Sequence, residues 1–150
     1  MFIQTLRRFG TNKDLGILLL RVSLGLFFFV SGVFKFENLK ATIGFFSQIG
    51  LGSFWVYVAS SAEILSGLLL ILGIFIWIAA ALIVIIMIVA IYLGTGPNPQ
   101  GQSFFLHLIS GWGPNVVYAA AALTIALCGA GRWSIADWVY KKKSEQAEVR

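Results

Sequence analysis

Residues 64–93 read ILSGLLLILGIFIWIAAALIVIIMIVAIYL, and no position among them carries a charged side chain. Together with the apolar residues that precede it, this stretch would form one straight helix about 60 Å long, twice the thickness of a bilayer's hydrocarbon core. Gly73 lies near its middle and is the natural place for the helix to break. The stretch therefore predicts two membrane spans, residues 54–73 and 74–92, joined as a tight antiparallel hairpin.

Two further apolar runs flank this hairpin, residues 15–34 and residues 114–131. Of the 150 residues, 59% are hydrophobic and only 11% are charged, whereas soluble domains have about 25% charged residues. The deficit is too large for a surface that faces water, so lipid must cover most of the outside. We predict an all-α, integral membrane four-helix bundle.

The segments between the spans predict interfacial connectors and two charged ends. Residues 35–52 are too polar to cross a bilayer and too aromatic to float free, and residues 104–109 are too short to span. Residues 94–99, GTGPNP, end the third span. The predicted organisation is a cytoplasmic leader (1–14), a four-span membrane domain (15–140) and a charged cytoplasmic tail (141–150).

The distribution of basic residues predicts the orientation. Three precede the first span and five follow the fourth, while the first connector holds two and the last connector none. By the positive-inside rule, both termini lie in the cytoplasm. The first run is longer than a signal-peptide core and lacks a cleavage site, so we expect it to be retained. The net charge of +5 is then explained by lipid head groups and topology, and we expect no nucleic-acid partner.

Two spans carry polar side chains at helical spacing, and these form the predicted intramembrane site. Charged groups inside a bilayer are costly and mark partners or function. Small residues on the same stripes let helices approach closely. The first span supplies Arg21, Gly25, Phe28, Gly32 and Lys35; the second supplies Ser60, Glu63, Ser66 and Gly67. We expect these two faces to pack together, with the three glycines as packing positions.

Three interpretations of the charges follow. Arg21 and Glu63 could form a structural ion pair that docks the two helices, or they could serve a ligand or a proton between them. In the third, Arg21 only reaches the cytoplasmic head groups. Because helical side chains lean toward their own N-terminus, Arg21 leans toward the cytoplasm and Glu63 away from it, which leaves room for water or a polar ligand.

The remaining candidate residues lie near the last connector. His107 is the only histidine and Cys128 the only cysteine, so we expect no multi-histidine haem or metal site and no intramolecular disulfide. His107 is either a hydrogen-bonded structural residue or, beside Trp112, a contact for a quinol-type head group. We expect no covalently bound cofactor.

Three stretches resemble the DoxX family of small bacterial membrane proteins. The first runs LRVSLG from Leu20 and SGVFKF from Ser31, similar to the family's arginine, glycine and G-x-x-K opening. The second is AEILSGLLLILG from Ala62, like its acidic second span. The third, GAGRWSIAD from Gly129, is similar to the family's terminal G-P-G-R-x-S-x-D, although Ala130 replaces the proline and Ala136 moves Asp137 by one place.

The resemblance implies a subunit of a quinone-linked membrane oxidoreductase or of a redox-stress complex, in the bacterial inner membrane. It implies a bound quinone and a soluble redox partner or further membrane subunits. Two alternatives remain: a non-catalytic membrane scaffold, or a small-solute or proton transporter acting as a homo-oligomer. The sequence leaves open whether the protein is an enzyme.

Overall fold

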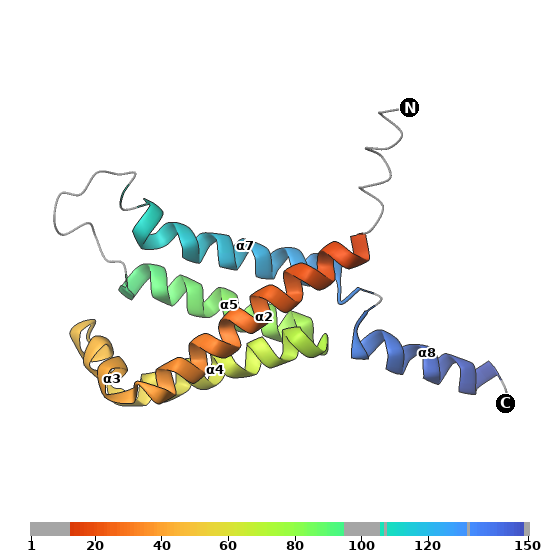
Figure 1. Ribbon diagram of the computed structural model, residues 1–150, viewed down its shortest axis with the longest axis horizontal. Helices are drawn as coiled ribbons and strands as arrows, with labels where there is room; N and C mark the ends of the chain where they lie inside the picture. The colour runs from red at the N-terminus through yellow and green to blue at the C-terminus, as the bar shows by residue number, and fades with distance from the viewer. Residues whose placement is uncertain (1–12, 95–105, 107, 132, 149–150) are drawn as a thin grey trace, which may run out of the picture.

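The computed structural model describes residues 13–94, 106, 108–131 and 133–148, and these fold into helices joined by short turns (Figure 1). The helices are α2 (Lys13–Glu37), α3 (Leu39–Gln48), α4 (Ser53–Leu72), α5 (Ile76–Val89), α7 (Gly113–Cys128) and α8 (Ile135–Glu148), with π-helical segments η1 (Ala90–Gly94) and η2 (Leu108–Trp112). Among the described residues, three helices are long and apolar enough to cross a membrane, and α7 is a shorter apolar helix. The predicted all-α membrane bundle is confirmed.

The predicted break at Gly73 is also confirmed. α4 ends at Leu72, and Gly73 takes the left-handed conformation with φ of +70°. Its N–H donates to the carbonyl oxygens of Leu69 and Leu70, which closes the helix end as glycine caps commonly do. Phe75 has φ of +46°, and α5 then begins at Ile76. Because the chain reverses direction here, α4 and α5 lie side by side as an antiparallel pair.

The helices pair as α2 against α4 and as α5 against α7, with the α4–α5 hairpin joining the two pairs (Figure 1). The centre is filled by apolar side chains from all four helices, which include Phe28, Leu70, Ile83 and Ile125. Many large apolar side chains on the outside are exposed, such as those of Val30 and Ile85. In a membrane protein these outward residues contact lipid acyl chains, so their exposure is the expected arrangement.

Two helix bounds differ from the prediction, and a predicted domain boundary falls inside a helix. α2 continues through Lys35 to Glu37, so the first connector is shorter than 35–52 and its helical part is α3. α7 ends at Cys128 instead of residue 131, because Gly129 and Gly131 have positive φ. The predicted tail boundary at 140/141 falls within α8. Residues 95–99, 104, 105 and 107 of the predicted connectors lie outside the described part.

The start of the last apolar helix also differs. η2 and α7 follow one another without a break, with 5 and 16 residues. Pro114 lies in the first turn of α7, where its fixed φ suits a helix, and it supplies no N–H to the bonds between η2 and α7. Residues 108 and 109, assigned above to an interfacial segment, therefore belong to the same helical rod as α7. At 1.5 Å per residue this rod is about 31 Å long.

Candidate functional site

A seam of glycines brings α2 and α4 into backbone contact. A Cβ atom at Gly25 would lie 2.8 Å from the Gly67 carbonyl oxygen, and one at Gly32 would lie 2.7 Å from the carbonyl oxygen of Ser60. From the other side, a Cβ at Gly67 would lie 2.6 Å from the Gly25 carbonyl oxygen. The structure thus brings the three predicted packing glycines together in one interface. Only glycine fits at this separation.

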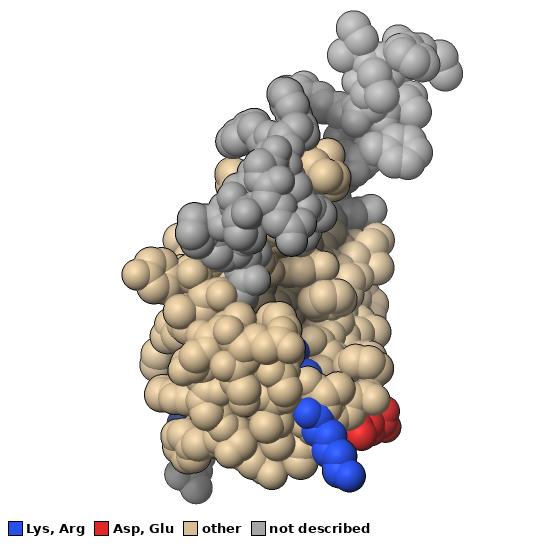
Figure 2. Space-filling view, turned by 90° about the vertical axis from the view of Figure 1, so that its left-hand side faces the viewer, with Lys and Arg blue, Asp and Glu red and all other residues tan. Residues whose placement is uncertain are grey.

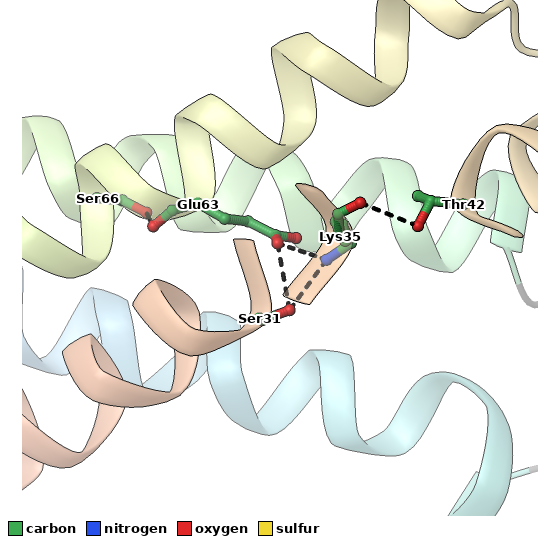
Figure 3. A network of polar contacts seen from close by, with 5 residues as sticks. All are labelled: Ser31, Lys35, Thr42, Glu63 and Ser66. Atoms are coloured by element: carbon green, nitrogen blue, oxygen red, sulfur yellow. Dashed lines mark hydrogen bonds and ion pairs between the residues drawn. The ribbon is translucent and has the colours of Figure 1, made fainter. Parts of the chain in front are cut away.

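At one end of the seam, Lys35 of α2 pairs with Glu63 of α4 (Figure 3). The Lys35 Nζ donates to Glu63 Oε2 and also to the hydroxyl of Ser31, at 2.9 Å. The Ser31 hydroxyl in turn donates to Glu63 Oε2 at 3.2 Å. The Glu63 side chain is only 6% exposed, against 24% for Lys35. Together, Ser31, Lys35 and Glu63 form a closed polar triad, in which each member bonds to the other two.

The predicted pairing of Arg21 with Glu63 is wrong, and side-chain direction explains why. α2 and α4 are antiparallel, and helical side chains lean toward the N-terminus of their own helix. Glu63 therefore leans toward the α3 end of the bundle, where Lys35 lies at the end of α2. Arg21 leans the opposite way. The ion pair joins Lys35, in the last turn of α2, to Glu63, near the middle of α4.

Arg21 belongs to the other end of the bundle. Its side chain is buried, and the guanidinium donates to the carbonyl oxygens of Ala130 and, at 2.7 Å, of Trp133. Both acceptors lie in the turn between α7 and α8, whose glycine conformations leave carbonyl groups without helical partners. The guanidinium also packs against Gly73, because a Cβ there would overlap it. Arg21 thus ties α2 to the α4–α5 turn and to the α7–α8 turn.

The other predicted site residues are dispersed. Ser66 is buried and donates to the backbone carbonyl of Glu63 at 3.1 Å. Ser60 is fully buried, and its hydroxyl has no hydrogen-bond partner among the described residues. Trp112 directly precedes α7 and is not among the residues that line the cavity beside the triad. His107 lies outside the described residues.

A cavity of about 530 Å³ opens beside the triad, within the 300–1,000 Å³ range of small-molecule sites. α2, α3, α4, α5 and α7 all contribute to its wall. Polar side chains are confined to a few positions, and the rest of the wall is apolar or aromatic. Its polar members are Ser31, Lys35, Glu63, Asn115 and Tyr118, and its apolar members include Phe28, Phe45, Phe46, Trp55, Ala59 and Met87.

The cavity lies at the α3 end of the bundle, which faces the viewer in Figure 2. The described surface there is mostly tan, with one blue side chain and a red group protruding at its lower edge and a few blue atoms recessed between tan ones. Sequence reasoning missed Ser31, Asn115 and the contribution of α3. One feature of the sequence could have identified Ser31: it lies four residues before Lys35, on the same face of the helix. An apolar cavity with one charged corner suits an amphiphilic molecule whose polar head bonds to the triad.

Among the described residues, no group of three His, Cys, Asp or Glu side chains is placed to hold a metal ion. The triad offers one ammonium, one carboxylate and one hydroxyl. Through these groups it can donate and accept hydrogen bonds.

Comparison with known proteins gives one curated relative and no solved structure that matches. Over 61 residues the chain is 46% identical to the "Putative oxidoreductase CatD" of Bacillus subtilis (strain 168). The alignment covers 41% of this chain and 46% of that protein, so the chain spans less than half of the relative's length. The DoxX family model matches residues 16–96, which contain α2 except its first three residues, all of α3, α4 and α5, and the whole triad. The chain is therefore a member of the DoxX family, as its sequence motifs suggested.

Proposed function

We propose that this protein is the membrane subunit of a quinone-linked oxidoreductase and that its cavity holds the quinone head group against Lys35 and Glu63. The observation that carries the proposal is the cavity itself, about 530 Å³ with an ion pair at one corner of a mostly apolar wall. The name of the Bacillus relative, "Putative oxidoreductase CatD", supports redox chemistry.

The chemistry of a quinone matches this wall. Its ring carries two carbonyl oxygens in the oxidised form and two hydroxyl groups in the reduced form. The Lys35 ammonium donates hydrogen bonds to the first, and the Glu63 carboxylate accepts them from the second. The aromatic side chains of Phe28 and Trp55 line the same cavity and suit the flat ring. The apolar tail then extends along the remaining wall into lipid.

The redox step divides the work between this chain and a partner. Reduction of a quinone to a quinol consumes two electrons and two protons. We assign quinone binding and proton exchange at Glu63 to this chain, and electron transfer to a partner that carries the redox centre, either a soluble protein or another membrane subunit. Oxidation of the quinol follows the same path in reverse.

The proposal includes four spans in the bacterial inner membrane, with both termini in the cytoplasm. The continuous η2–α7 rod, about 31 Å long, supports the fourth span because a typical hydrocarbon core is about 30 Å thick. The distribution of basic residues supports the orientation. In this arrangement the cavity opens near the outer face, and Arg21 lies near the cytoplasmic face.

The test is the quinone content of protein extracted gently from native membranes. We expect a stoichiometric quinone in the wild-type protein and at least a fivefold loss in Glu63→Gln. Glu37→Gln is the matched control, because Glu37 is an exposed carboxylate at the end of α2. Protein partners without quinone would favour the scaffold function instead. Neither quinone nor partners, together with pH-driven uptake into liposomes, would favour the transporter.

A further inference from the structure

α8 leaves the bundle after the Arg21-bound turn and extends away from it (Figure 1). Within the described residues, it forms no extended packing with another helix. It has 14 residues, a length at which isolated helices are only marginally stable in water. Its visible supports are local, and one is a cap in which the Ser134 hydroxyl accepts the N–H of Asp137 at 3.1 Å. Contact with a surface outside the described chain would stabilise the helix further.

The helix has two unlike faces. Ile135, Trp138 and Val139 follow the i, i+3, i+4 spacing of one face, and all three are exposed. Asp137 and Lys141 lie on the opposite face and form an ion pair at 2.7 Å. The charges of the polar face are thus paired within the helix, while the apolar face forms no extended packing with another helix in the described part of the chain.

Two lysines continue the apolar stripe. Lys142 and Lys143 follow Trp138 and Val139 by one turn, and the Lys142 Nζ lies 5.3 Å from the centroid of the Trp138 ring. Lysine stems cover apolar surface while their ammonium groups reach outward. This combination of tryptophan, aliphatic side chains and flanking lysines is typical of helices that lie in the plane of a membrane interface.

The position of α8 selects the membrane as the occupant of this face. Leu127, in the last turn of α7, is 88% exposed, so the surface of the bundle that faces lipid reaches the α7–α8 turn. Trp133 is exposed in that turn, one residue before the Ser134 cap. α8 therefore starts where the lipid-facing surface of the bundle ends. In Figure 1 it runs out past that end, so contact of its apolar face with the bilayer requires the helix to tilt about Ser134.

We propose that α8 lies on the bilayer surface, with its apolar face inserted between the head groups and Lys142 and Lys143 bound to anionic phospholipids. The three lysines of α8 are matched in number by Asp137, Glu145 and Glu148, so apolar burial supplies most of the attachment. The lysines add the preference for anionic lipid, since they border the inserted face. Arg21 fixes where the helix starts.

The experiment uses the full-length protein in liposomes, with Cys128→Ser as background and a single labelled cysteine. Val139→Cys lies on the apolar face, and Ser144→Cys, about 140° around the helix, is the matched control. Both carry the same environment-sensitive fluorophore, and an unchanged helix content by circular dichroism checks folding. Ile135→Cys, on the same face, replaces Val139→Cys if that variant does not fold.

In vesicles of phosphatidylcholine with one quarter phosphatidylglycerol, we expect lipid-borne spin labels to quench position 139 at least threefold more than position 144. Aqueous iodide should give the reverse order. Replacement of phosphatidylglycerol by phosphatidylcholine, or Lys142→Gln with Lys143→Gln, should weaken the lipid quenching at position 139. Equal iodide quenching at both positions, indifference to anionic lipid, or protection that rises with protein concentration or an added partner would overturn the proposal.

Discussion

At the α3 end of the bundle, the buried Glu63 carboxylate is paired with the Lys35 ammonium, whereas at the opposite end the Arg21 guanidinium bonds to backbone carbonyls. Arg21 and Lys35 are 14 positions apart on α2, about 21 Å along the helix. The first arrangement borders a cavity and consists of side chains that can exchange partners. The second closes a turn, and its acceptors cannot move without unfolding that turn. The comparison separates the end at which we propose ligand binding from a structural end.

The largest effect on stability should come from the structural end. Arg21→Gln removes the donors to the carbonyls of Ala130 and Trp133, and a buried carbonyl without a partner is costly. We expect a loss of about 2–4 kcal/mol in the free energy of unfolding. SDS titration in mixed micelles, followed by circular dichroism, measures it. Lys40→Gln, at an exposed position of α3, is the control and should change little; equal losses in the two variants would contradict the structural role of Arg21.

The seam between the two ends should be the next most sensitive region. Gly67→Ala places a methyl group against the backbone of α2, and we expect a loss of about 1–3 kcal/mol from overpacking. Gly16→Ala is the matched control, because Gly16 lies in α2 with open space around its Cβ position. That variant should be neutral or slightly stabilising, since alanine favours a helix. A tolerated Gly67→Ala would mean that the helices do not touch here.

The ligand-binding end should respond with a smaller loss of stability and a larger loss of ligand. Removal of one partner from a fully buried ion pair costs about 3–5 kcal/mol. Lys35 keeps its bond to Ser31 and is partly exposed, so Glu63→Gln should cost only about 1–2 kcal/mol.

The exchange of both charges, Lys35→Glu with Glu63→Lys, separates the two roles of the pair. We expect the double variant to recover most of the stability lost in Glu63→Gln, because an ion pair forms again. The double variant should not recover the bound quinone, because the hydrogen-bond donor and acceptor have changed places on the cavity wall. Recovery of both would show that the pair acts on the cavity only through packing.

The smallest effect should come from Ser31→Ala. This change removes one hydroxyl from the triad but leaves the ion pair intact, so we expect about 0.5–1.5 kcal/mol and a partial loss of quinone. Ser61→Ala, an exposed serine on α4, is the control. A Ser31→Ala variant without quinone would place the main ligand contact on Ser31.

The sequence predicted the bundle well because membrane spans depend on local properties. The lengths of the apolar runs located the helices. Gly73 located the hairpin, since glycine readily adopts the left-handed backbone conformation found at this helix end. The glycine spacing also predicted that α2 and α4 meet. These features follow from composition and helical periodicity alone.

The candidate site was less accessible to prediction. Charge and depth selected Glu63, Lys35 and Arg21, but a full account of side-chain direction was needed to choose Lys35 over Arg21 as the partner of Glu63. The acceptors of Arg21 are backbone carbonyls, which no residue type reveals. The cavity depends on how α3, α5 and α7 approach the triad, and this is a property of tertiary packing.

Photolabelling of native membranes with an azidoquinone, followed by mapping of the labelled residues, tests the central claim most directly. The account predicts label on the cavity wall, at residues such as Trp55 or Phe45, which excess unlabelled quinone displaces and Glu63→Gln reduces at least fivefold. Glu37→Gln should leave the label unchanged. Label spread over the lipid-facing surface, with no response to competitor or to Glu63→Gln, would contradict a quinone site beside the Lys35–Glu63 pair.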